Sequence, residues 1–347
     1  MSYQVTIQPS GHTFAVDASE SVLDAALRQG IILPYGCRNG ACGSCMGTVT
    51  TGSVAYRHGL PPALNEQDAA SHKALFCQAQ PACDLTIRVR EVDAARDIEI
   101  KTLPCRVEKL EHLAHDVIRI YLRMPASERM QFLAGQYIDV LIKEHEPRAF
   151  SIANAPHDDE FIELHIRYVE GGLFTDQVFH HMQEKVMLRI RGPLGTFFLR
   201  EDSERPALLI GGGTGFAPLK GILEHAFETG ISKPLHLFWG VRARRDLYLD
   251  DLPARWAREH ENFSYTPVLS EPAAEDNWSG ETGLVTDSVV RHYPELSGHD
   301  IYMSGPPVMV EAGHGLFMQH GLDTARFFSD AFEYAAVAEN IKGLQQD

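Results

Sequence analysis

Four cysteines carry the chemistry that this sequence indicates most clearly. Cys37, Cys42 and Cys45 lie within nine residues of one another, and Cys77 follows thirty-two residues after Cys45. A spacing of four residues, then two, then a distant fourth cysteine is typical of the thiolates that hold a 2Fe–2S cluster. The loop also contains glycines that let backbone N–H groups approach the sulfur atoms: Gly36, Gly40, Gly43 and Gly47. We therefore predict that the four cysteines are metal ligands.

A structural zinc site is the alternative for the same residues. Cys42 and Cys45 alone have the spacing of a zinc-binding pair. Zinc ribbons usually combine two such pairs, however, and the residues around Cys77 supply no second one. The other two cysteines, Cys83 and Cys105, stand in apolar, strand-like stretches. There we expect small buried side chains rather than disulfide partners.

The segments around the cysteine loop predict a small mixed domain over residues 1–92. Alternating residues on both sides of a Pro-Ser-Gly turn indicate a β-hairpin, and an apolar face indicates a helix. The expected elements are strands at 3–8, 12–16, 46–50, 53–56 and 84–90, a helix at 21–29 and a helical turn at 65–71. With its cysteine spacing, this stretch resembles the plant-type ferredoxin family. The resemblance implies a β-grasp fold around a 2Fe–2S cluster.

The charged stretch at residues 93–101 indicates a short linker. A pattern of short alternating segments follows it. Residues 102–201 contain many short alternating segments separated by Gly and Pro, which predicts a small antiparallel β-barrel. The sequence Gly171-Gly172-Leu173-Phe174-Thr175 precedes an expected helix. Glycines there would let backbone amides approach a pyrophosphate, and a helix N-terminus favours an anion. We therefore predict that Gly171, Gly172, Leu173 and Thr175 bind a cofactor.

Together with Arg148-Ala149-Phe150-Ser151 and Gly192-Pro193-Leu194-Gly195, this segment resembles the flavin-binding barrel of the ferredoxin–NADP reductase superfamily. The resemblance implies that Arg148 contacts the flavin phosphate, that Phe150 stacks on the isoalloxazine ring and that Ser151 hydrogen-bonds nearby. The family usually has Tyr where this chain has Phe150. Stacking survives that change, but a hydroxyl contact to the ribityl chain is lost.

Residues 202–347 alternate strand, loop and helix, which predicts a doubly wound parallel sheet. The apolar run 207–210 is followed by Gly211-Gly212-Gly213-Thr214-Gly215-Phe216-Ala217-Pro218. Phe216 stands where the dinucleotide fingerprint would have its third glycine. The loop instead resembles the nicotinamide-domain segment of the same reductase superfamily. The residues expected to bind the coenzyme are Gly212, Gly213, Thr214, Gly215 and Pro218.

A second segment, Ser304-Gly305-Pro306-Pro307, resembles the Cys-Gly-Pro-Pro segment that lies beside the nicotinamide in this superfamily. Ser304 replaces the cysteine, and we expect it to act at the hydride-transfer site, with Gly305 and Pro306 binding the coenzyme. The aromatic segment that ends in Phe332 and Tyr334 resembles the closing segment of bacterial flavin reductases. Either aromatic is a candidate to lie near the flavin, and packing of a last strand is the alternative.

The loop 240–248 follows the second strand of this domain, where the adenosine ribose would lie. Arg242, Arg244 and Arg245 offer positive charge for a 2′-phosphate, whereas Asp246 would oppose it. We predict NADH as the coenzyme, with NADPH as the alternative and with Arg242 and Asp246 near the ribose.

Composition excludes several other functions. The net charge of −16 disfavours a nucleic-acid partner, because binding to phosphates needs a basic face. The first residues lack the features of a signal peptide, and no apolar run approaches the length of a membrane span. We therefore expect a cytoplasmic, multi-domain protein with α+β and α/β parts.

The predicted domains form an electron path from NADH to FAD, to the 2Fe–2S cluster and then to a partner protein. A nicotinamide gives up two electrons as hydride, whereas the cluster takes one at a time, so a flavin is needed between them. The whole chain resembles the reductase components of bacterial multicomponent oxygenases and the reductases that act with CDP-6-deoxy-glucoseen dehydratases. This resemblance favours FAD over FMN, and an oxygenase component or a sugar-nucleotide dehydratase as the electron acceptor. We expect the rim of the cysteine loop, Arg38, Asn39 and Ala41, to face that acceptor.

Two alternatives remain open. The first is a free-standing flavin or acceptor reductase with an accessory cluster. The second is a redox-sensing module. The second alternative draws on Phe150 and Ser304, the two departures from the superfamily segments.

Overall fold

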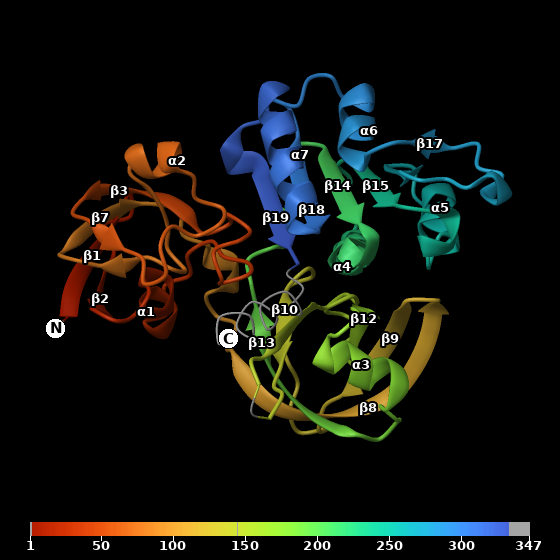
Figure 1. The fold of residues 1–347 in the computed structure, drawn as a ribbon, viewed down its shortest axis with the longest axis horizontal. Coiled ribbons are helices and arrows are strands. Elements are labelled where there is room, and N and C mark those ends of the chain that lie inside the picture. The colour runs from red at the N-terminus through yellow and green to blue at the C-terminus, as the bar shows by residue number, and fades with distance from the viewer. Residues whose placement is uncertain (1, 144, 333–347) are drawn as a thin grey trace, which may run out of the picture. The chain divides into compact units, whose positions relative to one another are not determined.

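The first part of the chain folds around a five-stranded sheet in the computed structural model, which describes residues 2–143 and 145–332 (Figure 1). The strands lie in the order β2-β1-β7-β3-β5. Strand β7 runs parallel to β1, and the other pairs given by register are antiparallel. Their bounds are β1 Ser2–Gln8, β2 Thr13–Asp17, β3 Met46–Thr51, β5 Lys73–Leu75 and β7 Leu85–Arg88. This arrangement confirms the predicted β-grasp domain.

Helix α1 (Val22–Arg28) packs its apolar side on this sheet, and its start is fixed locally. Ser21 Oγ accepts a hydrogen bond from Asp24 N at 3.0 Å, which satisfies one of the free amides at the helix start. The cysteine loop runs from the end of α1 to β3. Smaller elements complete the domain: β4 (Val54–Ala55), β6 (Gln80–Pro81) and α2 (Glu66–Ala70).

The middle of the chain forms the predicted antiparallel barrel, with strand order β11-β10-β13-β8-β9-β12. Past the end of β11, Ala153 N donates to Glu163 O at 2.8 Å, so the two edge strands nearly close the barrel. Its interior is apolar, with Ile120, Ile138 and Leu164 among the buried side chains. The bounds are β8 Lys101–Ala114, β9 Val117–Arg123, β10 Tyr137–Val140, β11 Arg148–Ser151, β12 Ile162–Arg167, β13 Met187–Leu194 and α3 Leu173–His180.

The last part of the chain forms a six-stranded sheet in the order β17-β16-β15-β14-β18-β19. Strand β14 lies between β15 and β18 and is parallel to both. The chain therefore leaves β14 toward one side and later returns to its other side, which creates a topological switch point at the carboxyl end of β14. The strands are β14 Ala207–Gly212, β15 Leu235–Val241, β16 Phe263–Leu269, β17 Glu281–Thr282, β18 Asp300–Gly305 and β19 Phe327–Ala331.

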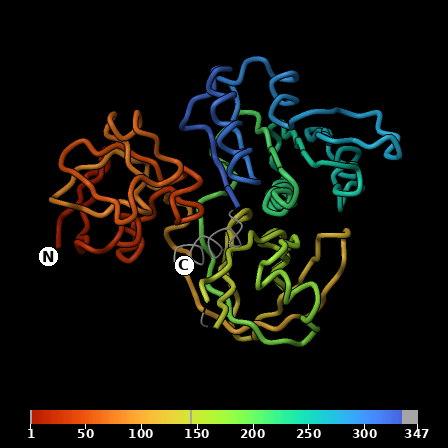
Figure 2. Tube along the Cα trace, viewed as in Figure 1, coloured from red at the N-terminus to blue at the C-terminus, as the bar shows by residue number. Residues whose placement is uncertain are grey.

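Four helices accompany this sheet, as the tube in Figure 2 also shows: α4 (Phe216–Glu228), α5 (Asp251–Glu259), α6 (Val285–His292) and α7 (Pro307–Gln319). Two of them, α4 and α7, begin directly after the carboxyl ends of β14 and β18. The segments predicted to bind the coenzyme therefore join a parallel strand to the start of a helix, which is where open α/β sheets bind ligands.

The described chain divides into two compact units. One consists of the N-terminal part up to Ile98 with Gly195–Phe197 and Ser329–Ala331, and the other holds the barrel and the parallel sheet. The expected linker includes a single 3-10 turn, Asp93–Ala95. The barrel and the parallel sheet thus belong to one unit, and the boundary between them near residue 201 stays a prediction.

We predict that Gly47→Ala weakens the cysteine-loop domain. A Cβ at Gly47 would collide with the ring of Phe76 and would lie 3.1 Å from Arg88 O. Overpacking of this kind costs about 1–3 kcal/mol, and Phe76 directly precedes Cys77. Urea unfolding followed by visible absorbance, together with iron content, measures the effect. Thr48→Ala in the same strand is the control, and equal midpoints and equal iron for the two variants would contradict the prediction.

Candidate functional site

The four cysteines predicted as ligands come together in one loop region of the N-terminal unit. Cys42 N donates to Cys37 Sγ at 3.3 Å, and Cys37 N donates to Cys42 Sγ at 3.5 Å. Cys45 and Cys77 are buried, with 3% and 5% of their surface exposed. A Cβ at Gly36 would lie 3.2 Å from Cys42 Sγ, so the loop needs a glycine at this position to close around the sulfur atoms.

Electrostatics in the loop favour a metal-binding thiolate. The hydrogen bond from the Cys37 thiol is the main reason that the pKa of Cys42 falls to about 6. The same hydrogen bond and burial raise the pKa of Cys37, and the pKa of Cys45 is raised in the same way through its hydrogen bond with Cys77. Four sulfur donors with amides directed at them fit an iron–sulfur cluster.

The rim residues of this loop are held by local interactions. Arg38 has a positive φ of 64° and forms an ion pair with Asp24 of α1. Asn39 Oδ1 accepts from Ala41 N at 3.3 Å. These contacts hold the loop in shape, and a role for Arg38, Asn39 and Ala41 in partner binding stays a prediction.

The first flavin segment forms strand β11. Phe150 packs against the barrel core, and its ring centroid lies 5.4 Å from that of Phe174 at a tilt of 43°. Ser151 is buried, and Arg148 Nη1 donates to Glu146 O at 2.6 Å. The strand thus carries a guanidinium, an aromatic ring and a hydroxyl within four residues, and their roles in flavin binding stay predictions.

The predicted anion-binding segment precedes helix α3. Gly171 has a φ of +74°, which favours glycine, and Gly172 is the N-cap residue. Thr175 Oγ1 accepts from Val169 N at 3.2 Å and donates to Val169 O at 3.1 Å. Its hydroxyl therefore stabilises the turn that shapes the segment. Leu173 is 47% exposed, and its part in cofactor binding stays a prediction.

The two coenzyme segments touch each other at the switch point of the parallel sheet. A Cβ at Gly215 would collide with the carbonyl of Ser304, and a Cβ at Gly212 would lie 2.5 Å from Met309 Sδ and 3.1 Å from Pro306 Cδ. At Gly215 only a glycine lets the backbones of the two loops approach so closely, whereas Gly212 makes room for the end of the Met309 side chain. The loops predicted separately from the sequence therefore form one surface.

Phe216 explains why this loop departs from the dinucleotide fingerprint. Its ring stacks on Trp239 at a centroid distance of 4.1 Å and a tilt of 17°. Trp239 Nε1 in turn donates to Gly213 O at 2.9 Å, where Gly213 has a φ of +56°. An aromatic side chain thus replaces the third glycine and supports the loop from beneath. Thr214 and Pro218 are buried around it.

Ser304 is fully buried, and its Oγ has no hydrogen-bond partner among the described residues. A buried hydroxyl without a partner costs free energy, and a bound group that approached this loop would relieve that cost. Phe332 N donates to Gly305 O at 2.9 Å, so the end of the described chain lies beside the second coenzyme segment. Tyr334 lies outside the described residues.

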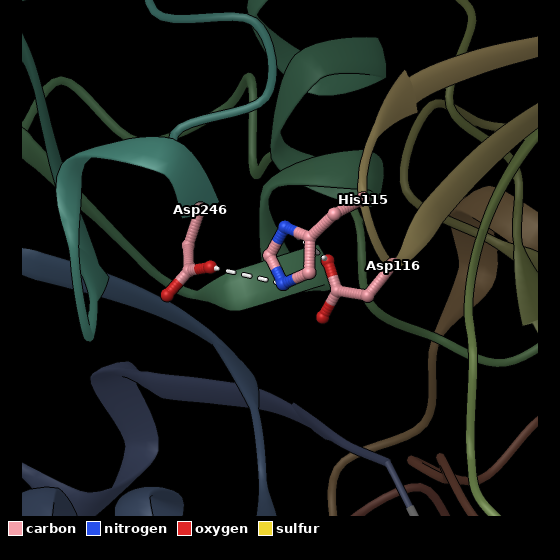
Figure 3. Close-up of side chains that lie close together, drawn as sticks. All are labelled: His115, Asp116 and Asp246. Atoms are coloured by element: carbon pink, nitrogen blue, oxygen red, sulfur yellow. Dashed lines mark ion pairs between the residues drawn. The ribbon is translucent and has the colours of Figure 1, made fainter.

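Asp246, predicted to lie near the ribose, is buried, whereas Arg242 and Arg245 have exposed side chains. Asp246 Oδ2 accepts from Ala243 N at 3.1 Å, which shapes the loop after β15. Figure 3 shows its other oxygen facing His115 of the barrel hairpin, at 3.8 Å from Nε2. The sequence alone gave no sign of this contact.

His115 lies between Asp246 and Asp116, and the ligand atoms of these three side chains lie within 4.8 Å of one another, close enough to hold a metal ion. Nδ1 of His115 lies 3.8 Å from Asp116 Oδ1, and Nε2 lies 3.8 Å from Asp246 Oδ1 (Figure 3). Arg167 Nε lies 3.1 Å from Asp116 Oδ2, and Arg242 and Arg245 each approach Asp246 to 4.0 Å. With a guanidinium group near each carboxylate, this is the geometry of an ion-pair cluster.

Sequence reasoning also missed a buried polar network between the barrel and helix α4. Glu163 and His165 are two residues apart on β12, and Glu163 Oε2 accepts from Lys220 Nζ of α4 at 3.2 Å. His165 Nε2 lies 2.8 Å from Glu163 Oε1, and its Nδ1 lies 3.0 Å from Tyr248 OH. The only sequence signal was a pair of polar residues on one face of a strand otherwise rich in apolar ones.

Comparison with known proteins shows the same three parts. Family models described as 2Fe-2S iron-sulfur cluster binding domain, oxidoreductase FAD-binding domain and oxidoreductase NAD-binding domain match residues 5–82, 104–199 and 209–314. Among the solved structures, the Amycolatopsis cytochrome P450 reductase GcoB is 33% identical with a TM-score of 0.76, covering 96% of this chain and 99% of that one.

Two curated relatives match nearly full length. The chain is 38% identical to the CDP-6-deoxy-L-threo-D-glycero-4-hexulose-3-dehydrase reductase of Yersinia pestis, over 96% of this chain and 99% of that protein. It is 37% identical to the phenol hydroxylase P5 protein of Acinetobacter pittii, over 95% and 96%. Within the part of the chain that the structure describes, no helix is long and apolar enough to cross a membrane.

Substituting one predicted ligand tests the cluster site. Cys42→Ser is expected to lose the cluster, because it removes the thiolate of lowest pKa. Iron and sulfide content and the EPR signal after dithionite reduction measure the loss. Cys83→Ser is the control, since Cys83 lies outside the predicted ligand set and contacts Ser53 Oγ at 3.9 Å. A full cluster in Cys42→Ser, or zinc in place of iron in the unaltered protein, would contradict the assignment.

Proposed function

We propose that this chain passes electrons from NADH to a partner oxygenase. The chain belongs to the branch of the ferredoxin–NADP reductase superfamily that carries a plant-type 2Fe–2S domain. It is an oxidoreductase, and its three domains are those that bind a 2Fe–2S cluster, FAD and NAD. FAD, when bound, takes two electrons as hydride and releases them one at a time, as a one-electron cluster requires.

One observation carries this proposal. A loop of four cysteines with converging amides and a pair of glycine-lined loops at the switch point occur in the same chain as the flavin-type barrel. A free-standing flavin reductase has no need of the cysteine loop. A redox sensor has no need of two backbones shaped for a dinucleotide. Full-length relatives named as reductases support the same conclusion.

The residues of the chain divide the work of binding. The Phe150 face offers a stacking surface for the isoalloxazine ring, and Arg148 and Ser151 lie beside it for the phosphate and ribityl groups. Gly212 to Gly215 would hold the coenzyme pyrophosphate through their backbone amides. Arg167 lies against Gly213 and adds positive charge there. Contacts of this kind would orient the two cofactors.

The partner is either an oxygenase component or a sugar-nucleotide dehydratase. Relatives named for each are almost equally similar, at 38% and 37% identity. The solved structure at 33% identity is a cytochrome P450 reductase, which favours a partner that activates oxygen. Incubating the reduced chain with the oxygenase or dehydratase encoded by a neighbouring gene, and following loss of the reduced-cluster signal, distinguishes the two.

We further propose NADH as the coenzyme and the cytoplasm as the location. The choice of NADH rests on the resemblance to this branch of reductases. Asp246 adds no support, because its buried carboxylate accepts a hydrogen bond within its own loop. Cys83 and Cys105, the two cysteines outside the proposed cluster site, form no disulfide in the structure, as a reducing compartment would favour.

Anaerobic titration with NADH tests the proposed function. We expect the flavin absorbance to bleach and the EPR signal of a reduced 2Fe–2S cluster to appear, with NADPH less effective at equal concentration. In Cys42→Ser, bleaching should persist without the cluster signal. If NADH reduces neither group, the proposed activity is wrong, and if it reduces the flavin but never the cluster, the free-standing flavin reductase is the better description.

A further inference from the structure

We propose that Lys220 and Gly221 of helix α4 are positioning residues for hydride transfer, because they fix the coenzyme loop against the barrel segment that continues the flavin strand. This inference rests on the proposed function. Both residues lie in the same compact unit as the barrel. Neither belongs to the segments that the sequence singled out for cofactor binding.

Lys220 is buried at a position where a lysine needs partners for its charge. Its side chain is 6% exposed, and all three donors of its ammonium group are used. Nζ donates to Ala153 O at 3.1 Å, to Glu163 Oε2 at 3.2 Å and to Glu224 Oε2 at 3.0 Å. Two of these acceptors belong to the barrel, so the ammonium group connects helix α4 to it.

Gly221 sets how closely the helix approaches. A Cβ at this position would lie 2.8 Å from Asn154 O and 3.4 Å from Ile152 O. Asn154 has little room to move, because its side chain donates to Asp158 O at 2.6 Å and to Phe161 O at 3.0 Å. Backbone atoms of the barrel thus lie directly against the helix, and only a glycine allows the contact.

A second connection runs through His165 and Tyr248. His165 Nδ1 and Tyr248 OH lie 3.0 Å apart. The ring of Tyr248 also contacts that of Trp239, with 5.1 Å between the two ring centroids. Trp239 donates to Gly213 O. Burial lowers the pKa of His165, and the hydrogen bond and charge of Glu163 oppose this shift. Burial alone would raise the pKa of Glu163, but the hydrogen bond from His165 and the charge of Lys220 lower it to about 2.

These contacts connect the two cofactor surfaces over a short stretch of chain. Ile152 directly follows Ser151 of the flavin strand, and Lys220 lies one helical turn after Gly215 of the coenzyme loop. Hydride transfer requires the donor and acceptor carbons at near-contact distance, and a displacement of about 1 Å costs on the order of 100-fold in rate. The Lys220 and Gly221 contacts therefore control the rate of transfer more than the affinity for NADH.

Stopped-flow reduction of the full-length protein by NADH tests this role. In Gly221→Ala, we expect the limiting rate of flavin bleaching to fall by roughly tenfold or more, with a dissociation constant for NADH within about twofold of the unaltered value. A full isotope effect with 4-deuterated NADH shows that the hydride step is measured. Gly315→Ala in helix α7 is the matched control, because a Cβ there meets no atom within 4 Å.

Lys220→Met and Lys220→Arg provide a second pair that does not depend on Gly221→Ala folding. Hydrogen–deuterium exchange without NADH should speed up at 152–154 and 216–228 in Lys220→Met, and Lys220→Arg should restore part of the protection and of the rate. An unchanged bleaching rate in Gly221→Ala or Lys220→Met, or a loss confined to NADH affinity, would overturn the proposal. Failure of the unaltered protein to react with NADH would instead overturn the proposed function.

Discussion

Direct contact between two backbones at the switch point of the parallel sheet is the constraint on which the coenzyme site depends. The loop after β14 and the loop after β18 approach so closely that a side chain at Gly215 would strike the carbonyl of Ser304. The glycines remove that obstacle, and the stacked pair of Phe216 and Trp239 supports the loop from inside. The two loops therefore meet at the carboxyl ends of β14 and β18, the place where open α/β sheets bind nucleotides.

The same principle of close backbone approach recurs at the other sites. Gly36 lets the cysteine loop close on Cys42, and Gly221 lets helix α4 rest on the barrel. In each case a missing side chain permits contact, and charged or polar groups then fix it: the amide-to-sulfur hydrogen bonds at the cluster and the Lys220–Glu163 pair at the helix. Geometry and electrostatics therefore act together at the cluster loop and along the contact between barrel and helix.

Motifs with a short local signal were predictable from the sequence. The cysteine spacing and the two glycine loops need no knowledge of the fold, and the β-grasp, barrel and parallel sheet followed from the order of their elements. Strand lengths were less predictable: the sequence indicated short strands over 102–201, whereas β8 (Lys101–Ala114) has 14 residues and pairs first with β13 and then with β9. The Lys220–Glu163 contact was unpredictable, because its partners are 57 residues apart. Asp246 was placed at the ribose by its charge, yet its carboxylate points inward to shape the loop.

In the proposed function, electrons travel from NADH to the cluster within a single chain. Rapid-freeze EPR after mixing the protein with excess NADH, repeated over a tenfold range of protein concentration, tests this most directly. We expect the cluster to be reduced after the flavin, with a first-order rate constant that does not change on dilution. A rate that rises in proportion to protein concentration, or a cluster reduced before the flavin, would contradict it.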